Sequence, residues 1–120
     1  MKSLNKQDCD VLIDKCINLV KKQDSNFFVL KKLKKVWGMC YWDWIELDPR
    51  KNFIVTAIHE CLHYLNPDWS ESMVMYAESR IINQVEFLKL MEFVSILSSK
   101  LYIKEKNKKR NNKNKEQKTI

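Results

Sequence analysis

Both histidines of this 120-residue chain lie in one short motif, His59-Glu60-Cys61-Leu62-His63, which has the pattern H-E-x-x-H. On a helix, residues four positions apart lie one above the other on the same face, so the two histidines can bind one metal ion together. Glu60 lies beside them, where a carboxylate can accept a proton from an attacking water. Two imidazoles suit zinc, which at a catalytic site keeps one coordination position for water. The motif therefore predicts a zinc centre with a general base. The alternative is a chance spacing on a solvated helix face.

The residues around the motif indicate an amphipathic helix with defined ends. Apolar residues recur at helical spacing at Ile54, Ile58, Cys61, Leu62 and Leu65. The histidines fall on the neighbouring face, which we expect to border a cleft. Asp48-Pro49 predicts the N-cap and first turn, with Asn52 as an alternative start. Asn66-Pro67 predicts the end of the helix.

A catalytic zinc ion normally has three protein ligands, so a third is expected downstream of the motif. Apolar residues repeat at helical spacing at Val74, Ala77, Ile81, Val85 and Leu88. Glu78 lies within this stripe, and a buried carboxylate is costly unless it has a partner. We expect Glu78 to be the third ligand, with an ordinary salt bridge as its alternative role. Glu71 and Asp68 are alternative ligands, although an acid at position 71 also suits the start of a helix.

Four segments of the sequence resemble one group of known proteins. Residues 44–50 (WIELDPR), 56–65 (TAIHECLHYL), 67–71 (PDWSE) and 74–78 are similar to small HExxH zinc metallopeptidase-like proteins of phages and bacteria, the minimal gluzincin or SprT-like end of the zincins. The resemblance covers about residues 36–85. It implies a minimal zincin-like domain with His59, His63 and Glu78 as Zn²⁺ ligands and Glu60 as general base. The chain departs from SprT proteins in having no third histidine, and it lacks the metzincin G-x-x-H continuation.

The hydrophobic pattern predicts an α+β fold that is mostly helical, with three or four helices. Residues 5–22 form the first helix, whose inward face is Cys9, Leu12, Ile13, Cys16, Ile17, Leu19 and Val20. Beyond Leu88 the helical pattern continues to Leu101, as one helix or as two with a break at Ser98-Ser99.

A short β-hairpin is expected to lie over the metal helix. The only glycine, Gly38, marks its turn, and the second strand ends at Leu47. The open edge of that strand could bind an extended peptide through main-chain hydrogen bonds. The residues expected beside such a peptide are Trp42, Trp44 and Ile45. The alternative is that these side chains are core and edge cover in a small domain.

The positive charge of the chain is concentrated at its end. Residues 104–120 hold eight of the 22 Lys and Arg residues and two of the 15 Asp and Glu residues, so they carry +6 of the net charge of +7. We therefore expect one domain over residues 1–103 and a disordered basic tail over 104–120. The tail could bind nucleic acid non-specifically, or could serve only for solubility.

Cysteine usage and the first residues indicate a reducing compartment. Cys9, Cys16, Cys40 and Cys61 form no C-x-x-C pair, which favours free, buried thiols. The chain opens with polar residues, and no apolar stretch is long enough to span a membrane. We expect a cytoplasmic protein without membrane contact, in the host cytoplasm if phage-encoded.

These expectations combine into one main functional hypothesis. The protein would hydrolyse peptide bonds of a peptide or protein substrate with a zinc-activated water and Glu60 as general base. The alternative is a catalytically silent zinc-binding interaction protein, associated with nucleic acid through its tail.

Overall fold

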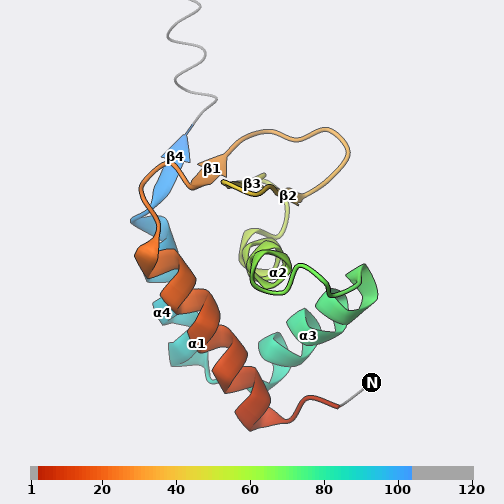
Figure 1. Ribbon diagram of the computed structural model, residues 1–120. Coiled ribbons are helices and arrows are strands. Elements are labelled where there is room, and N and C mark those ends of the chain that lie inside the picture. Colours follow the sequence, from red (N-terminus) through yellow and green to blue (C-terminus); the bar gives the residue numbers. More distant parts are fainter. Residues whose placement is uncertain (1–2, 104–120) are drawn as a thin grey trace, which may run out of the picture.

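The computed structural model describes residues 3–103, which form an α+β fold that is mostly helical (Figure 1). Its helices are α1 (Lys6–Lys22), α2 (Phe53–Leu65), α3 (Glu71–Gln84) and α4 (Phe87–Ser98). Its strands are β1 (Phe28–Leu30), β2 (Gly38–Cys40), β3 (Ile45–Leu47) and β4 (Leu101–Ile103). Within these residues the predicted class is confirmed. The predicted basic tail, residues 104–120, lies outside the described part of the chain.

The strands form one small mixed sheet in the order β2-β3-β1-β4. β1 runs parallel to both β3 and β4, whereas β2 and β3 form an antiparallel hairpin. β1 reaches β4 only after the chain has passed through β2, β3 and the last three helices. β2 and β4 are therefore the two edges of the sheet, and β3 lies inside it.

The hairpin is present, but its turn lies further along the chain than predicted. Gly38 and Met39 belong to β2, and residues 41–44 make the turn. The backbone N–H of Tyr41 donates to the carbonyl of Trp44 (2.8 Å), and the two rings stack with centroids 4.5 Å apart. The prediction of a turn at Gly38 is wrong, because the stacked rings of Tyr41 and Trp44 close the hairpin. Gly38 instead lies in β2, where it packs closely against α2.

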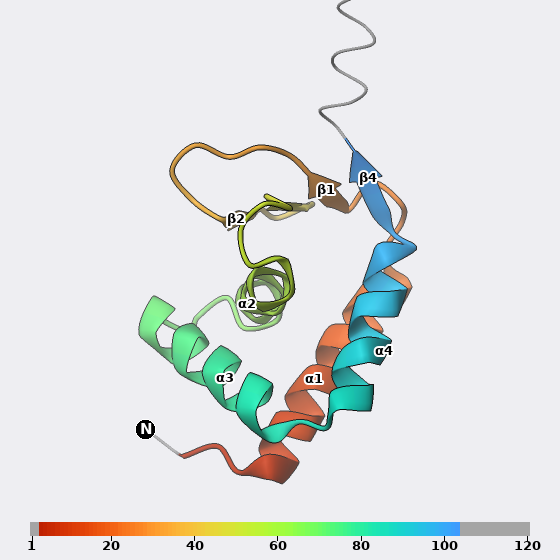
Figure 2. The same cartoon turned by 180° about the vertical axis from the view of Figure 1, so that it is seen from behind.

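The helices enclose the core on two sides of the motif helix. α2 lies beneath the hairpin, between the sheet and α3, and α1 and α4 lie side by side on the other flank (Figures 1 and 2). All seven residues predicted for the inward face of α1 are buried. Within residues 3–103, no helix combines the length and apolar character needed to cross a bilayer.

The predicted long C-terminal helical pattern is interrupted twice. Val85 ends α3 with an extended backbone (φ −79°, ψ 146°), so Leu88 leaves the predicted stripe and is 80% exposed. α4 then ends at the predicted Ser98-Ser99 break. Leu101 begins β4 instead of continuing a helix, because it pairs with Phe28 of β1. Helical periodicity cannot reveal a strand that is completed by a partner far away in the sequence.

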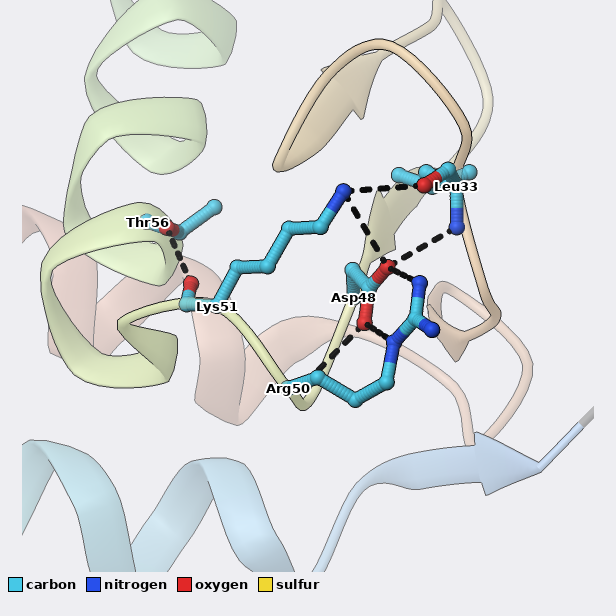
Figure 3. Close-up of polar contacts among 5 residues, drawn as sticks. All are labelled: Leu33, Asp48, Arg50, Lys51 and Thr56. Atoms are coloured by element: carbon cyan, nitrogen blue, oxygen red, sulfur yellow. Dashed lines mark hydrogen bonds and ion pairs between the residues drawn. The ribbon is translucent and has the colours of Figure 1, made fainter.

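The buried carboxylate of Asp48 forms hydrogen bonds and ion pairs with residues just before α2 and in the β1–β2 loop (Figure 3). Asp48 accepts hydrogen bonds from the Arg50 guanidinium (2.6 and 2.8 Å) and from the backbone N–H of Leu33 (2.9 Å). Lys51 lies 3.7 Å from the same carboxylate and donates to the carbonyl of Leu33 (3.0 Å). Asp48 thus ties the β1–β2 loop to the segment before α2.

The helix itself starts later than the first choice from the sequence. Asn52 is the N-cap of α2, with a left-handed backbone (φ 47°), as the alternative prediction had it. The prediction of Asp48 as N-cap is wrong because its carboxylate is engaged by Arg50 and Leu33. The hydrogen bonds from Arg50 hold the pKa of Asp48 well below its usual value, although burial opposes them.

Candidate metal centre

Three side chains from two helices bring potential ligand atoms together. His59 and His63 lie one turn apart on α2, with ring centroids 4.9 Å apart. Their Nε2 atoms both face Glu71, at 3.1 Å from Oε2 for His59 and 2.8 Å from Oε1 for His63. The three ligand atoms all lie within 4.8 Å of one another, and no other such group of His, Cys, Asp or Glu occurs in residues 3–103.

Glu71 reaches the histidines because of how α3 begins. The Ser70 side chain caps the helix by accepting from the backbone N–H of Met73 (3.1 Å), which fixes Glu71 in the first turn. That turn follows a short connection from the end of α2. Partial burial raises the pKa of Glu71, but its hydrogen bonds with His63 and His59, together with their charges, outweigh burial and lower it overall.

Glu78, the predicted third ligand, occupies a different position. Its Oε1 lies 2.6 Å from Nδ1 of His59, on the ring edge away from Glu71, and its side chain is 19% exposed. The structure therefore brings Glu78 to His59 but leaves it out of the three-ligand group. Asp68 is exposed in the connection and also lies outside that group. The sequence places both glutamates two turns apart on one helix face, and only the crossing of α2 and α3 decides which meets both rings.

Glu60 lies on the side of α2 that faces the hairpin. It is 8% exposed, and burial raises its pKa; the charges of His59 and His63 oppose this shift. The predicted stripe of α2 is confirmed at Ile58, Cys61 and Leu62, which are fully buried, and Leu65 packs against the core. The prediction for Ile54 is wrong, since it is 39% exposed; the helix face turned toward β2 carries Thr56 and Glu60 instead.

Gly38 makes that close packing feasible, a role that the sequence did not reveal. A Cβ atom at this position would lie 2.8 Å from Cγ2 of Thr56 and 2.9 Å from Cγ of Glu60. Both distances are shorter than van der Waals contact. Any larger residue here would push β2 away from α2 or displace the Glu60 side chain. That Gly38 is the only glycine in the chain was the available signal.

The histidines open into a cleft of about 1250 Å³. Its walls come from β2, the hairpin turn, α2 and the first half of α3. Of the three residues predicted to lie beside a substrate, Trp42 and Trp44 line this cleft, whereas Ile45 is fully buried and does not. Trp37 and Met75 also line it, and neither was predicted from the sequence.

The open strand edge belongs to β2, so the predicted edge at residues 41–47 is wrong. β3 pairs with β2 on one side and β1 on the other. In the hairpin, the Asp48 N–H donates to Trp37 (2.9 Å) and the Tyr41 N–H donates to Trp44 (2.8 Å). Hydrogen-bonded pairs alternate in an antiparallel ladder, so the N–H and C=O groups of Gly38 and Cys40 point away from β3.

Of the four cysteines, Cys40 is the one that lines the cleft. Burial together with the charge of Glu60 raises its pKa to about 11. It does not belong to the group of His59, His63 and Glu71. Cys9, Cys16 and Cys61 are buried in the core.

No protein-family model, curated protein or solved structure matches this chain. The resemblance to zincins therefore stays a prediction that depends on the residues of the motif and on their geometry. Chemically, the site offers two imidazole nitrogens and one carboxylate around one point. The carboxylate of Glu78 lies on the other nitrogen of His59, and that of Glu60 is buried beside them.

Proposed function

We propose that the protein is a zinc-dependent peptidase with a minimal zincin-like site, in which His59, His63 and Glu71 hold the metal. The observation that carries this proposal is the convergence of both histidine Nε2 atoms on the Glu71 carboxylate. Two imidazoles and one carboxylate form a ligand set found in catalytic zinc sites. Glu71 replaces Glu78 as the proposed third ligand because Glu78 faces the other nitrogen of His59.

The donor set fits a metal better than it fits a purely structural ion pair. The carboxylate of Glu78 on Nδ1 favours the tautomer in which Nδ1 of His59 is protonated, leaving a lone pair on Nε2 for a metal. Carboxylates on Nδ1 of metal-bound histidines are common because they orient the ring and raise its basicity. Glu71 is 63% exposed, so it can reorient toward an ion without leaving a buried charge unpaired.

Glu60 is the proposed general base. A bound zinc ion would supply polarisation of the scissile carbonyl and a lower pKa for the attacking water. Glu60 would accept the proton of that water and pass it to the leaving amine. Its raised pKa suits this role, because a carboxylate whose pKa lies nearer to neutral pH is a stronger proton acceptor. Gly38 keeps β2 close enough to hold the Glu60 side chain at the cleft wall.

We propose that the main chain of the substrate binds along the edge of β2. The outward N–H and C=O groups of Gly38 and Cys40 can pair with an extended peptide as an added strand. Because Gly38 lies against Glu60, a peptide bound there would pass beside the proposed base.

Two measurements test the proposal. Zinc content after purification and zinc addition should approach one ion per chain in the wild type, and Glu71→Ala should lose most of it. Glu60→Gln should keep the zinc and abolish cleavage of a denatured, fluorescence-quenched protein substrate. A wild type that binds no zinc would overturn the metal site. Full zinc occupancy without any cleavage would instead favour a silent zinc-binding protein.

A further inference from the structure

Half of the large apolar side chains that are exposed in the described residues, six of twelve, line the cleft. These six are Val36, Trp37, Met39, Trp42, Trp44 and Met75. Trp42 is 88% exposed and Trp37 is 53% exposed. A concentration of this kind on a small domain marks an interaction surface.

Part of this wall is held in place before any ligand arrives. The indole N–H of Trp44 donates to the buried carboxylate of Glu46 (3.1 Å), and its ring stacks on Tyr41. Lys31 lies 3.7 Å from the same carboxylate. A preformed aromatic surface loses little conformational entropy on binding, which favours recognition of an apolar side chain.

The charges at the cleft exclude one class of ligand. The chain has 22 Lys and Arg residues, yet none of them lines the cleft in the described part of the protein. The charged lining residues are Asp43, Glu60, Glu71 and Glu78, beside the two histidines. Phosphate groups and acidic side chains would meet carboxylates there, so the cleft suits neither nucleic acid nor an acidic peptide.

From these observations we infer that the cleft selects extended peptide segments that carry a large apolar or aromatic side chain. This side chain belongs to a residue next to the peptide bond that lies beside His59 and His63. This inference rests on the proposed function for the position of the cleaved bond, but not for binding. The main chain of the peptide pairs with the edge of β2 at Gly38 and Cys40. Its apolar side chain lies against the wall formed by Trp42, Trp44 and Met75.

Binding of labelled peptides to the full-length Glu60→Gln variant tests this selectivity without requiring hydrolysis. The probe is a short fluorescein-labelled glycine–serine peptide with one central phenylalanine, read by fluorescence polarisation. Matched probes carry serine, lysine or aspartate at that position. We expect the phenylalanine peptide to bind about tenfold or more tightly than the serine peptide, because a Phe side chain loses most of its water contact. The aspartate peptide should bind most weakly.

Variants of the wall locate the binding surface. Trp42→Ala and Met75→Ser, both at exposed positions on different elements, should each reduce the preference for phenylalanine about threefold or more. Phe87→Ala is the matched control, since Phe87 is 72% exposed on α4 and does not line the cleft. Its preference should equal that of the parent protein.

Two outcomes would overturn the inference. One is equal affinity for all four peptides. The other is binding of a labelled single-stranded oligonucleotide to the parent protein that is lost in the Trp42→Ala variant. Zinc content measured on the same preparations separates these failures from a failure of the proposed function. A zinc-loaded protein without peptide preference would refute only the selectivity, whereas a zinc-free protein that prefers phenylalanine would refute only the metal site.

Discussion

The two ring nitrogens of His59 face two different carboxylates, and this asymmetry assigns them different roles. Nε2 shares Glu71 with His63, whereas Nδ1 contacts Glu78 at 2.6 Å. A carboxylate on Nδ1 orients an imidazole without occupying the metal position. The sequence identified all the residues of this group, because H-E-x-x-H fixes the histidines and the burial argument drew attention to Glu78. It ranked Glu78 above Glu71, whereas the structure brings Glu71 to both rings, because the order depends on the angle at which α3 crosses α2.

Substitution of Glu78 should weaken the metal site without abolishing it. Glu78→Ala is expected to lower zinc affinity about 10- to 100-fold, because the His59 ring loses its partner. Glu78→Gln should lose less, since the amide oxygen can still accept from Nδ1–H. Competition with a zinc-responsive chelating dye measures both affinities.

The control for this experiment is Glu92→Ala, an acidic position on α4 outside the cleft, which should bind zinc as the wild type does. If Glu78→Ala contained no zinc at saturating concentrations while Glu71→Ala remained loaded, the ligand assignment would have to be exchanged.

Gly38 is a second residue whose role depends on a neighbour. Gly38→Ala should destabilise the protein by about 1–3 kcal/mol, because the added methyl group meets Thr56 and Glu60 at distances below contact. Cleavage of the quenched substrate should fall as well, since Glu60 is displaced. Urea unfolding and the cleavage rate provide the two measurements.

A double variant tests the stated cause. Thr56→Ser removes the Cγ2 atom that lies closest to the added methyl group, so it should restore part of the stability of Gly38→Ala. A loss of the same size in the presence of Thr56→Ser would show that the crowding lies elsewhere.

At the scale of elements, the segment between β3 and α2 positions both the hairpin and the motif helix. Asp48 is fully buried and receives hydrogen bonds from Arg50 and from the backbone of Leu33. The chain thereby joins the β1–β2 loop to the start of α2. The sequence suggested an N-cap at Asp48 because Asp-Pro commonly begins a helix. The loop that Asp48 meets lies fifteen residues earlier, and local pattern cannot show such a contact.

The stability of the fold should depend on the ionisation of Asp48. Its pKa is lowered in the folded state, so the stabilisation is complete well above the ordinary value of 3.8 and is lost as pH falls below it. Asp48→Asn should destabilise the protein at pH 7 by about 2 kcal/mol, because the Arg50 guanidinium and the buried N–H of Leu33 lose their charged acceptor.

The pH dependence distinguishes a charge effect from a packing effect. Urea denaturation between pH 7 and pH 3 should show a steeper loss of stability in the wild type than in Asp48→Asn. Asp24→Asn, at an exposed position, serves as the control and should follow the wild type. Parallel curves for the wild type and Asp48→Asn would mean that the ionised carboxylate adds nothing.

At the scale of the whole molecule, two structural units meet around α2. The α1–α4 pair lies on one side of α2, and the hairpin and α3 lie on the other (Figures 1 and 2). Residues of the hairpin and α3 line the cleft. The inward face of α1 follows from hydrophobic periodicity and was predicted correctly in full. The strands β1 and β4 were not predicted, because three-residue strands give little periodic signal and their pairing is long-range.

Substitution of two phenylalanines on α4 tests how much this helix contributes to the stability of the core. Phe93 is fully buried, so Phe93→Ala should destabilise the protein by about 3–5 kcal/mol. Phe87→Ala, at an exposed position of the same helix, should change stability by no more than about 0.5 kcal/mol. Chemical denaturation followed by circular dichroism compares them, and equal losses would contradict the packing described for α4.

The way in which the β1–β2 loop is anchored bears on how this protein can diversify. Asp48 and Lys51 hold the loop through the N–H and the carbonyl of Leu33, which every residue except proline provides. These hydrogen bonds therefore do not depend on the side chains that follow in the loop, including Val36 and Trp37 at the cleft. Descendants of this gene could exchange that part of the wall, and with it the preferred ligand, while the scaffold beneath stays unchanged.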